Sequence, residues 1–158
     1  MTEPARVKAD LVPFRPEDAE KVMSWIDSGE TLQYLCGDDT WPPAEDLLAS
    51  WQKADAASYL LLADRRPVAY AEIWDRPLEQ AAEIGHLLVD PARRGRGYGT
   101  LMLRLLVERA AHHPRVRRVV LNFHHGDETV LGCYLKAGFE LVGSGPDGEG
   151  LRMERPAG

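Results

Sequence analysis

The sequence predicts one domain of the mixed α/β class. The chain has 158 residues, which is enough for one sizeable hydrophobic core and leaves little room for a second. Hydrophobic residues make up 44% of the chain and charged residues 28%, as in ordinary globular proteins. Segments typical of strands and helices follow one another in the order β-α-α-β-β-β-α-β-α-β-β, the pattern of a sheet combined with helices. We therefore expect a single domain over residues 1–158, with its core between about 5 and 155.

The first third of the chain is predicted to contain one strand and two helices. A proline followed by acidic residues, as at Pro16, favours the first turn of a helix, because proline needs no amide partner there and carboxylates suit the helix dipole. The expected order is a strand over residues 5–12, a helix from Pro16 to near Gly29 that turns Val22, Trp25 and Ile26 inward, a loop over 31–41, and a helix that begins at Pro42 or Pro43 and presents Leu47, Leu48 and Trp51.

The remaining two thirds are predicted to alternate between strands and helices. Two apolar runs flank a turn at residues 64–67 and predict a hairpin. The helix that begins near Gly99 has few polar positions, so we expect it to be buried against the sheet. The predicted elements are strands over 59–63, 68–74 and 83–89, a helix over 99–113, a strand over 116–123, a helix over 128–137, and a final pair of strands over 139–142 and 151–154.

Charge and cysteine content argue against several classes of protein. The chain has 19 basic and 25 acidic residues, a formal net charge of −6, whereas a general nucleic-acid binder needs a basic excess. No apolar run approaches the ~18 residues of a membrane span, and the N-terminus has no apolar block typical of a signal peptide. Cys36 and Cys133 lie far apart and show no metal-ligand spacing. These observations predict a soluble protein of the cytoplasm, with no nucleic-acid or membrane partner and no metal.

The charges are unevenly distributed along the chain. Residues 22–51 contain no Lys or Arg but include Asp27, Glu30, Asp38, Asp39, Glu45 and Asp46. Residues 93–118 contain eight arginines and a single acid, Glu108. If both stretches line one cleft, one end of it would favour a polyanion and the other a cation. Two solvated faces of opposite charge are the alternative.

A glycine-rich segment, Arg93-Arg94-Gly95-Arg96-Gly97-Tyr98-Gly99-Thr100, lies between a predicted strand and the buried helix. Glycines at alternate positions let the backbone pass close to a ligand, and the helix that follows directs the positive end of its dipole to the same point. With arginines beside it, the segment is predicted to hold phosphate oxygens. It lacks the Gly-Lys-Ser/Thr of a P-loop, and its Gly-x-Gly-x-Gly spacing disfavours a Rossmann-type oxidoreductase.

Two segments resemble the GCN5-related N-acetyltransferases. The run from Val89 to Gly99 is similar to their acyl-CoA signature, Arg/Gln-x-x-Gly-x-Gly/Ala, with Arg94, Gly97 and Gly99 at its fixed positions. Residues 134–139, Tyr-Leu-Lys-Ala-Gly-Phe, are similar to the family's Tyr-x-x-x-Gly-Phe ending. The resemblance covers about residues 5–155. It implies a twisted, mostly antiparallel mixed sheet with helices on both faces, and acetyl-CoA as co-substrate.

The resemblance also implies which residues bind acetyl-CoA. The fourth strand of the family diverges from the fifth, and the pantetheine arm fills the gap beside the backbone of Leu87, Leu88 and Val89. The pyrophosphate loop corresponds to Arg94, Gly95, Arg96, Gly97, Tyr98, Gly99 and Thr100. Asp127 stands where many members carry an asparagine that contacts the cofactor. An ionised aspartate can cap the following helix but cannot donate a hydrogen bond there.

Candidate catalytic residues follow from the same comparison. Tyr134 stands where many members place a tyrosine that protonates the departing thiolate, and a phenol with a pKa of about 10 suits that step. An alkylammonium acceptor must first lose a proton, and Glu72 and Glu83 are the candidate bases, with His86 third. Alternation along the strand would place Glu83, Gly85, Leu87 and Val89 on one face and Ile84, His86 and Leu88 on the other. The alternative to a catalytic role is a structural one: Tyr134 would be a core aromatic residue, and each glutamate an exposed carboxylate on a strand.

These features predict an N-acetyltransferase that moves acetyl directly from acetyl-CoA to a primary amine. In the family the first two helices line the acceptor side, and here they fall in the stretch without Lys or Arg. We therefore expect a cationic acceptor (an aminoglycoside, a polyamine or a protein amine), with Asp38, Asp39 and Trp41 among its contacts. The alternative is a catalytically silent acyl-CoA-binding sensor or partner domain. The sequence leaves the oligomeric state open, a homodimer included.

Overall fold

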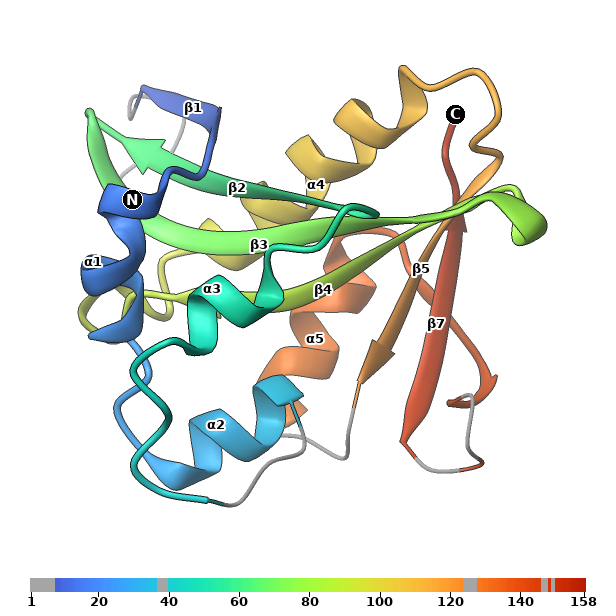
Figure 1. Ribbon diagram of the computed structural model, residues 1–158. Helices are drawn as coiled ribbons and strands as arrows, with labels where there is room; N and C mark the ends of the chain where they lie inside the picture. The colour runs from blue at the N-terminus through green and yellow to red at the C-terminus, as the bar shows by residue number, and fades with distance from the viewer. Residues whose placement is uncertain (1–7, 37–39, 124–127, 146–147, 149) are drawn as a thin grey trace.

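The computed structural model describes the chain except for residues 1–7, 37–39, 124–127, 146–147 and 149. One seven-stranded sheet runs through the molecule, in the spatial order β1-β2-β3-β4-β5-β7-β6 (Figure 1). The predicted hairpin is present, and the final two strands pair as expected. The strands are β1 Ala9–Pro13, β2 Ala56–Ala63, β3 Arg66–Arg76, β4 Ala81–Val89, β5 Arg118–Phe123, β6 Glu140–Ser144 and β7 Leu151–Pro156.

Helices cover both faces of this sheet, which confirms the predicted fold class (Figure 1). Apolar side chains form one buried cluster beneath α1, α2 and α3, and a second beneath α4 and α5. Tyr70 and Leu88 of the sheet belong to the first cluster, and Ile84 and Leu121 to the second. The helices are α1 Ala19–Met23, α2 Gly29–Cys36, α3 Leu47–Trp51, α4 Tyr98–Ala111 and α5 Glu128–Lys136.

The strands β4 and β5 begin as neighbours and then diverge (Figure 1). They pair in parallel, whereas the other neighbouring strands of the described sheet are antiparallel. Their last pair in register is Ile84 opposite Leu121, although β4 continues to Val89 and β5 to Phe123. The predicted divergence is therefore confirmed, and it leaves the second half of β4 without a partner strand on its β5 side.

A β-bulge in β4 lies where this divergence starts. The register between β3 and β4 shifts between Tyr70 and Glu72, and His86 has a φ of +51°, in the left-handed region. Ile84 and Leu87 consequently pack on the same side of the sheet, under α4 and α5. The predicted alternation, which placed these two on opposite faces, was wrong because the bulge breaks the period of two.

The predicted loop over residues 31–41 is wrong in its first half, because Gly29–Cys36 forms helix α2. The Ser28 hydroxyl accepts the backbone N–H three residues further on, at 3.1 Å, as an N-terminal capping residue does. Leu32 and Leu35, one turn apart, are both buried against the sheet. Gly29 was expected to end the preceding helix, but it begins this one.

The first and third helices are shorter than predicted. The helix α1 ends at Met23, although Trp25 and Ile26 beyond it are buried as expected. The helix α3 begins at Leu47 rather than at Pro42 or Pro43. These short helices are nevertheless anchored, because their apolar side chains join the cluster on that face of the sheet.

We expect Gly85→Ala to destabilise the protein. A Cβ at this position would lie 2.3 Å from an indole carbon of Trp74, so the ring would have to move. The expected loss in the free energy of unfolding is about 1–3 kcal/mol, measured by urea denaturation. Gly132→Ala in α5 is the control, since its Cβ meets nothing within 4 Å and helical alanine gains about 0.5–1 kcal/mol over glycine. Equal effects of the two substitutions would contradict the close packing of Trp74 on Gly85.

Candidate active site

The glycine-rich segment forms an open loop between β4 and α4. A 3₁₀ turn, Pro91–Arg93, follows the strand, and Asp90 Oδ1 accepts the Ala92 N–H at 3.0 Å. Gly95 and Gly97 have φ values of +79° and +84°, which glycine adopts at little cost. A Cβ placed on either glycine would meet nothing within 4 Å, and the amides of the first helical turn have no partner within the helix. The loop therefore offers an open, amide-lined site for an anion.

Arg94 connects this loop to the helices on the opposite face of the sheet. Its Nη2 lies 4.0 Å from Oδ1 of Asp27, which precedes α2, and both side chains are well exposed. The guanidinium is also close enough to Tyr34 to act against the rise in the pKa of that phenol. An exposed ion pair of this kind is weak, so a phosphate group can compete with Asp27 for Arg94.

The helices α4 and α5 meet immediately after the loop. Thr100 Oγ1 lies 3.2 Å from Cys133 Sγ, at hydrogen-bond distance for sulfur. A Cβ on Gly99 would also lie 3.2 Å from that sulfur, so the absence of a side chain lets the two helices approach. This contact fixes the start of α4 against the turn of α5 that carries Tyr134.

A buried hydrogen-bond acceptor lies on β5 at the point where this strand leaves β4. Asn122 is the first residue of β5 beyond its last pair with β4. Its Oδ1 is buried and has no hydrogen-bond partner among the described residues. Buried polar atoms are normally satisfied, so this oxygen suits an N–H group of a molecule in the gap. Asn122 was not among the predicted site residues, although it is a lone amide among the apolar side chains of residues 119–123.

Tyr134 lies on α5 beside Phe123, the last residue of β5. It is 3% exposed and its ring meets that of Phe123 edge to face, with the centroids 5.0 Å apart. Its hydroxyl lies 2.6 Å from the hydroxyl of Tyr34, which comes from α2. The hydroxyl pair joins the two hydrophobic clusters, because Tyr34 packs with the first and Tyr134 belongs to the second. Tyr34 escaped prediction since its segment was expected to be a loop.

Both phenols are held in their neutral form. Burial raises the pKa of Tyr34 to about 12, although its hydrogen bond with Tyr134 acts in the opposite direction. Burial also raises the pKa of Tyr134 well above its ordinary value, and the neighbouring Tyr34 adds to the rise. At neutral pH each hydroxyl therefore carries a proton that it can donate.

Glu72 is completely buried in the face covered by α1–α3, and its carboxylate is held by its neighbours. The Tyr70 hydroxyl donates to Oε2 at 2.5 Å, and Trp74 Nε1 donates to Oε1 at 2.7 Å. His86 Nδ1 lies 3.0 Å from the same Oε1. A buried carboxylate needs such partners, and here they leave it no direct route to a substrate. Burial raises the pKa of Tyr70, and the adjacent carboxylate of Glu72 raises it further.

Glu83, the other candidate base, is 9% exposed and belongs to an ion pair. Arg76 Nε donates to its Oε1 at 3.0 Å, and Arg76 Nη1 reaches Asp55 at 3.3 Å. The guanidinium also lies over the Trp74 ring, 5.4 Å from its centroid. Glu83 thus faces the same side of the sheet as Trp74, its partner in the β3–β4 register, but Arg76 already neutralises its charge.

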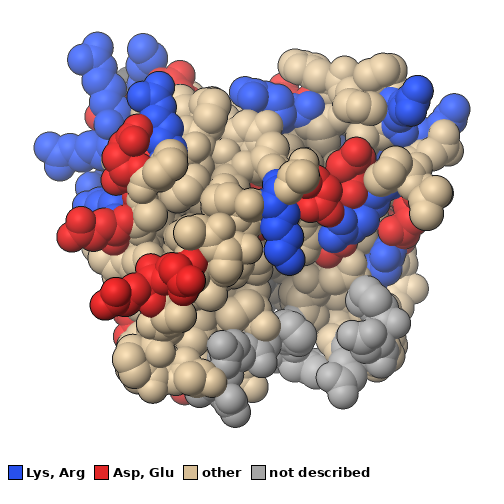
Figure 2. Space-filling view, in the orientation of Figure 1, with Lys and Arg blue, Asp and Glu red and all other residues tan. Residues whose placement is uncertain are grey.

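The acceptor side is only partly described. Asp38 and Asp39 lie outside the described residues, as does Asp127 of the expected cofactor site. Trp41, the third expected acceptor contact, is 48% exposed just before α3. Acidic side chains lie at the left of the face seen in Figure 2, below and beside a group of Lys and Arg side chains at the upper left. The described part of this face is consistent with attraction of a cation.

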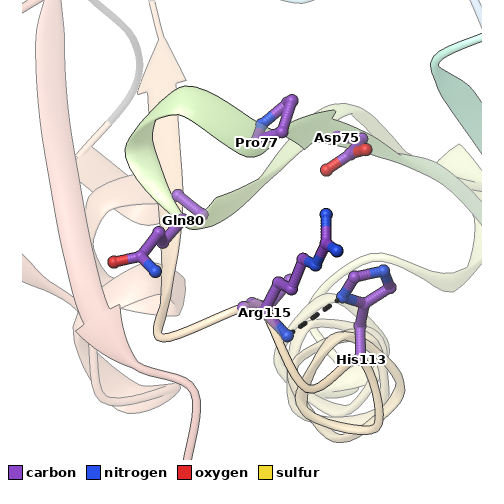
Figure 3. Close-up of a pocket in the computed structure, with 7 residues that line it drawn as sticks. Asp75, Pro77, Gln80, His113 and Arg115 are labelled. Atoms are coloured by element: carbon purple, nitrogen blue, oxygen red, sulfur yellow. Dashed lines mark hydrogen bonds between the residues drawn. The ribbon is translucent and has the colours of Figure 1, made fainter.

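Away from this site, the described residues line a further small cavity. A small cavity lined by Asp75, Pro77, Gln80, His113 and Arg115 lies beside the β3–β4 turn, where the Arg115 amide donates to His113 Nδ1 at 3.2 Å (Figure 3). Within the described ranges, no group of three or more His, Cys, Asp or Glu side chains is arranged to hold a metal ion. None of the helices described here is both long and apolar enough to cross a membrane.

The raised phenol pKa values predict a loss of stability at high pH. Tyr34 ionises near pH 10 when unfolded but only near 12 when folded, so the unfolded chain releases its proton first. The stability due to the neutral phenol is complete below about pH 10 and is lost as the pH rises toward 12. Tyr34→Phe should flatten this fall by up to about 2 kcal/mol, measured by urea unfolding between pH 9 and 12. If the free energy of unfolding depended on pH in the same way in both proteins, the folded state would not raise the pKa of Tyr34.

Known proteins share this sequence pattern and this fold. The sequence profile of the Acetyltransferase (GNAT) family matches residues 20–139. An aminoglycoside N(6')-acetyltransferase type 1 from Klebsiella pneumoniae is 23% identical over 154 residues, which cover 86% of this chain and 77% of that protein.

Solved structures agree with the family match. The aminoglycoside acetyltransferase AAC(6')-Ib in complex with coenzyme A and kanamycin has a TM-score of 0.74 at 20% identity, covering 94% of this chain and 95% of that one. A spermidine N-acetyltransferase from Vibrio cholerae, in complex with CoA and spermine, has a TM-score of 0.75 at 12% identity, again over 94% and 95%. At these identities the structures show a shared fold. Because the family profile matches well over half of the chain, the protein belongs to the GNAT family of acetyltransferases.

Proposed function

We propose that this protein transfers acetyl from acetyl-CoA directly to a primary amine of a cationic acceptor, of the aminoglycoside or polyamine class. The observation that carries the proposal is the gap that opens between β4 and β5 after Ile84. The phosphate loop lies at one end of the β4 segment that borders it, and Phe123 of β5 brings Tyr134 against it. The buried Oδ1 of Asn122 supports a ligand with an N–H group in the gap.

The chain's own groups suit the parts of acetyl-CoA. The amides of residues 94–100 and the side chains of Arg94 and Arg96 would hold the pyrophosphate, with Gly95, Gly97 and Gly99 allowing close approach. The backbone of residues 87–89 would pair with the amides of the pantetheine arm, because β4 has no partner strand there on the β5 side. Asp127, which lies outside the described residues, remains the candidate for a further contact with the cofactor.

Tyr134 would act as the general acid. Its hydroxyl is buried, neutral and hydrogen-bonded to Tyr34, so it carries a proton for the thiolate that leaves when the acetyl group is transferred. Tyr34, which is only half-buried, would return a proton to Tyr134 before the next turnover. The pair therefore forms a short route for protons between solvent and the buried acid.

The two glutamates would serve the acceptor amine in different ways. Glu72 is sealed from solvent, so it would assist deprotonation through a neighbouring side chain. Glu83, held by Arg76 on the same side of the sheet, would help attract the cation. Asp38, Asp39 and Trp41 would complete the acceptor side, together with the acids before α3. The related proteins act on aminoglycosides and spermidine by name, and such polycationic amines match this acidic region.

We place the enzyme in the cytoplasm, where acetyl-CoA is available and cysteines stay reduced; Cys36 and Cys133 form no disulfide. A homodimer of two copies of this chain is compatible with the proposal. The acetyl transfer itself needs only the groups of one chain.

We expect the purified protein to bind acetyl-CoA and to release free thiol when a cationic amine is added. The panel should contain kanamycin, spermidine and an N-terminal alanine peptide, with thiol release followed by a disulfide reagent. Tyr134→Phe should lower kcat by roughly 10²- to 10⁴-fold, because the general acid is lost, while acetyl-CoA affinity measured by calorimetry stays within about twofold.

The same assay separates the alternatives. Binding of acetyl-CoA without thiol release on any amine would contradict the enzyme and favour an acyl-CoA sensor. Loss of binding and rate together in Tyr134→Phe would show that Tyr134 shapes the site rather than protonating the thiolate.

A further inference from the structure

His86 is held by three side chains on the face of the sheet covered by α1–α3. Its ring stacks on Trp51 of α3, with the centroids 3.8 Å apart and the planes 17° apart. The Trp74 ring meets it edge to face, with the centroids 5.1 Å apart. Glu72 Oε1 lies 3.0 Å from its Nδ1. These contacts restrict the orientation of the imidazole.

The partners of Glu72 determine which nitrogen of His86 carries the proton. Trp74 Nε1 can only donate, so Oε1 accepts from it, and the Tyr70 hydroxyl donates to Oε2. A carboxylate can only accept hydrogen bonds, so in a carboxylate–imidazole pair His86 Nδ1 is the donor to Oε1. In a neutral imidazole the lone pair then lies on Nε2. The arrangement is that of a carboxylate that orients a general base.

The free nitrogen is accessible. Nε2 makes no hydrogen bond to the described residues. It is also not one of the fully buried polar atoms that lack a partner, so it retains contact with solvent. The side chain as a whole retains 13% of its exposure, whereas that of Glu72 retains none. Between the two members of the pair, a substrate can therefore reach only the imidazole.

His86 lies close to the point where β4 leaves β5, and its ring contacts α3 and β3 on the face covered by α1–α3. His86 lies two residues beyond Ile84, the last residue of β4 that pairs with β5, and immediately before the segment proposed to border the pantetheine arm. Its φ of +51° is unusual for a residue with a side chain, and such conformations are concentrated at functional sites. The β-bulge that this conformation creates turns His86 toward Trp51 and Glu72.

We infer that His86 Nε2 is the general base that deprotonates the acceptor amine, and that Glu72 is the positioning residue that fixes its tautomer and orientation. This inference rests on the proposed acetyltransferase function. It assigns to Glu72 an indirect role and removes Glu83 from the proton transfer.

The protons and electrons balance as follows. An ammonium proton of the acceptor moves to Nε2, and the freed lone pair of the nitrogen attacks the thioester carbonyl carbon. The C–N bond forms and the C–S bond breaks, with its electron pair going to sulfur, which takes a proton from the Tyr134 hydroxyl. The nitrogen loses its second proton as the intermediate collapses. This second proton passes to solvent, and Tyr134 regains a proton from solvent. The His86 imidazolium then releases the first proton to solvent.

His86→Asn tests the inference with little change to the fold. Asparagine tolerates the left-handed backbone, and its amide can still donate to Glu72, but it has no basic nitrogen. With kanamycin or spermidine, kcat/KM should fall roughly 10²- to 10⁴-fold, while acetyl-CoA affinity stays within about twofold.

The choice of nucleophile separates a base from a structural residue. A hydroxylamine-type acceptor, whose nitrogen is already neutral at pH 7, needs no base, so His86→Asn should slow it by less than about fivefold. His86→Gly, which also suits the backbone, should recover activity when imidazole is added. An equal loss with both acceptors and no recovery with imidazole would overturn the inference while leaving the acetyltransferase function intact.

A measurement without turnover completes the test. ¹⁵N NMR of the imidazoles, with His86 assigned from the His86→Asn spectrum, should show a neutral ring protonated at Nδ1. Glu72→Gln should weaken that preference. A ring protonated at Nε2 would overturn the inference even if the protein proves inactive, whereas absence of thiol release on every amine by the parent protein would overturn the proposed function instead.

Discussion

The parting of β4 from β5 after Ile84 is the constraint on which the rest of the site depends. Two parallel strands in continuous register would leave neither unpaired backbone beside residues 87–89 nor a buried position for the free oxygen of Asn122. The bulge at His86 coincides with this parting and changes the face on which the following side chains lie. Beyond the gap the chain enters the glycine loop and α4, so the anion site follows directly from the direction in which β4 leaves the sheet.

Side chains from the two faces of the sheet also contact each other near the point where β4 and β5 diverge. Tyr134 belongs to the cluster under α4 and α5, and Tyr34 packs with the cluster under α1–α3, yet their hydroxyls are 2.6 Å apart. Arg94 reaches from the loop to Asp27 before α2, which is a second link between the two sides. Tyr134, the proposed acid, belongs to one cluster, and His86, the proposed base, faces the other.

Local patterns in the sequence were sufficient to predict the glycine loop and most of the strands. The resemblance of two short segments to an acetyltransferase family added Tyr134 and the divergence of β4 from β5. Tyr34 was missed because Gly29 suggests a helix end, whereas the Ser28 cap and the burial of Leu32 and Leu35 start a helix there. Tyr70 and Trp74, two of the partners of Glu72, lie on the same strand, but His86 comes from β4. The stacking of Trp51 comes from a helix 35 positions earlier than His86, so no local pattern contains these two contacts of the imidazole. A bulge likewise depends on the partner strand, which is why simple alternation failed in β4.

The most direct measurement is a crystal structure of the protein with coenzyme A and a polycationic amine such as kanamycin or spermine. Our account predicts that the sulfur lies in the gap between β4 and β5, close to the Tyr134 hydroxyl, and that an amine of the acceptor lies within hydrogen-bond distance of His86 Nε2. Coenzyme A bound outside the gap, or an acceptor on the face covered by α4 and α5, would contradict it.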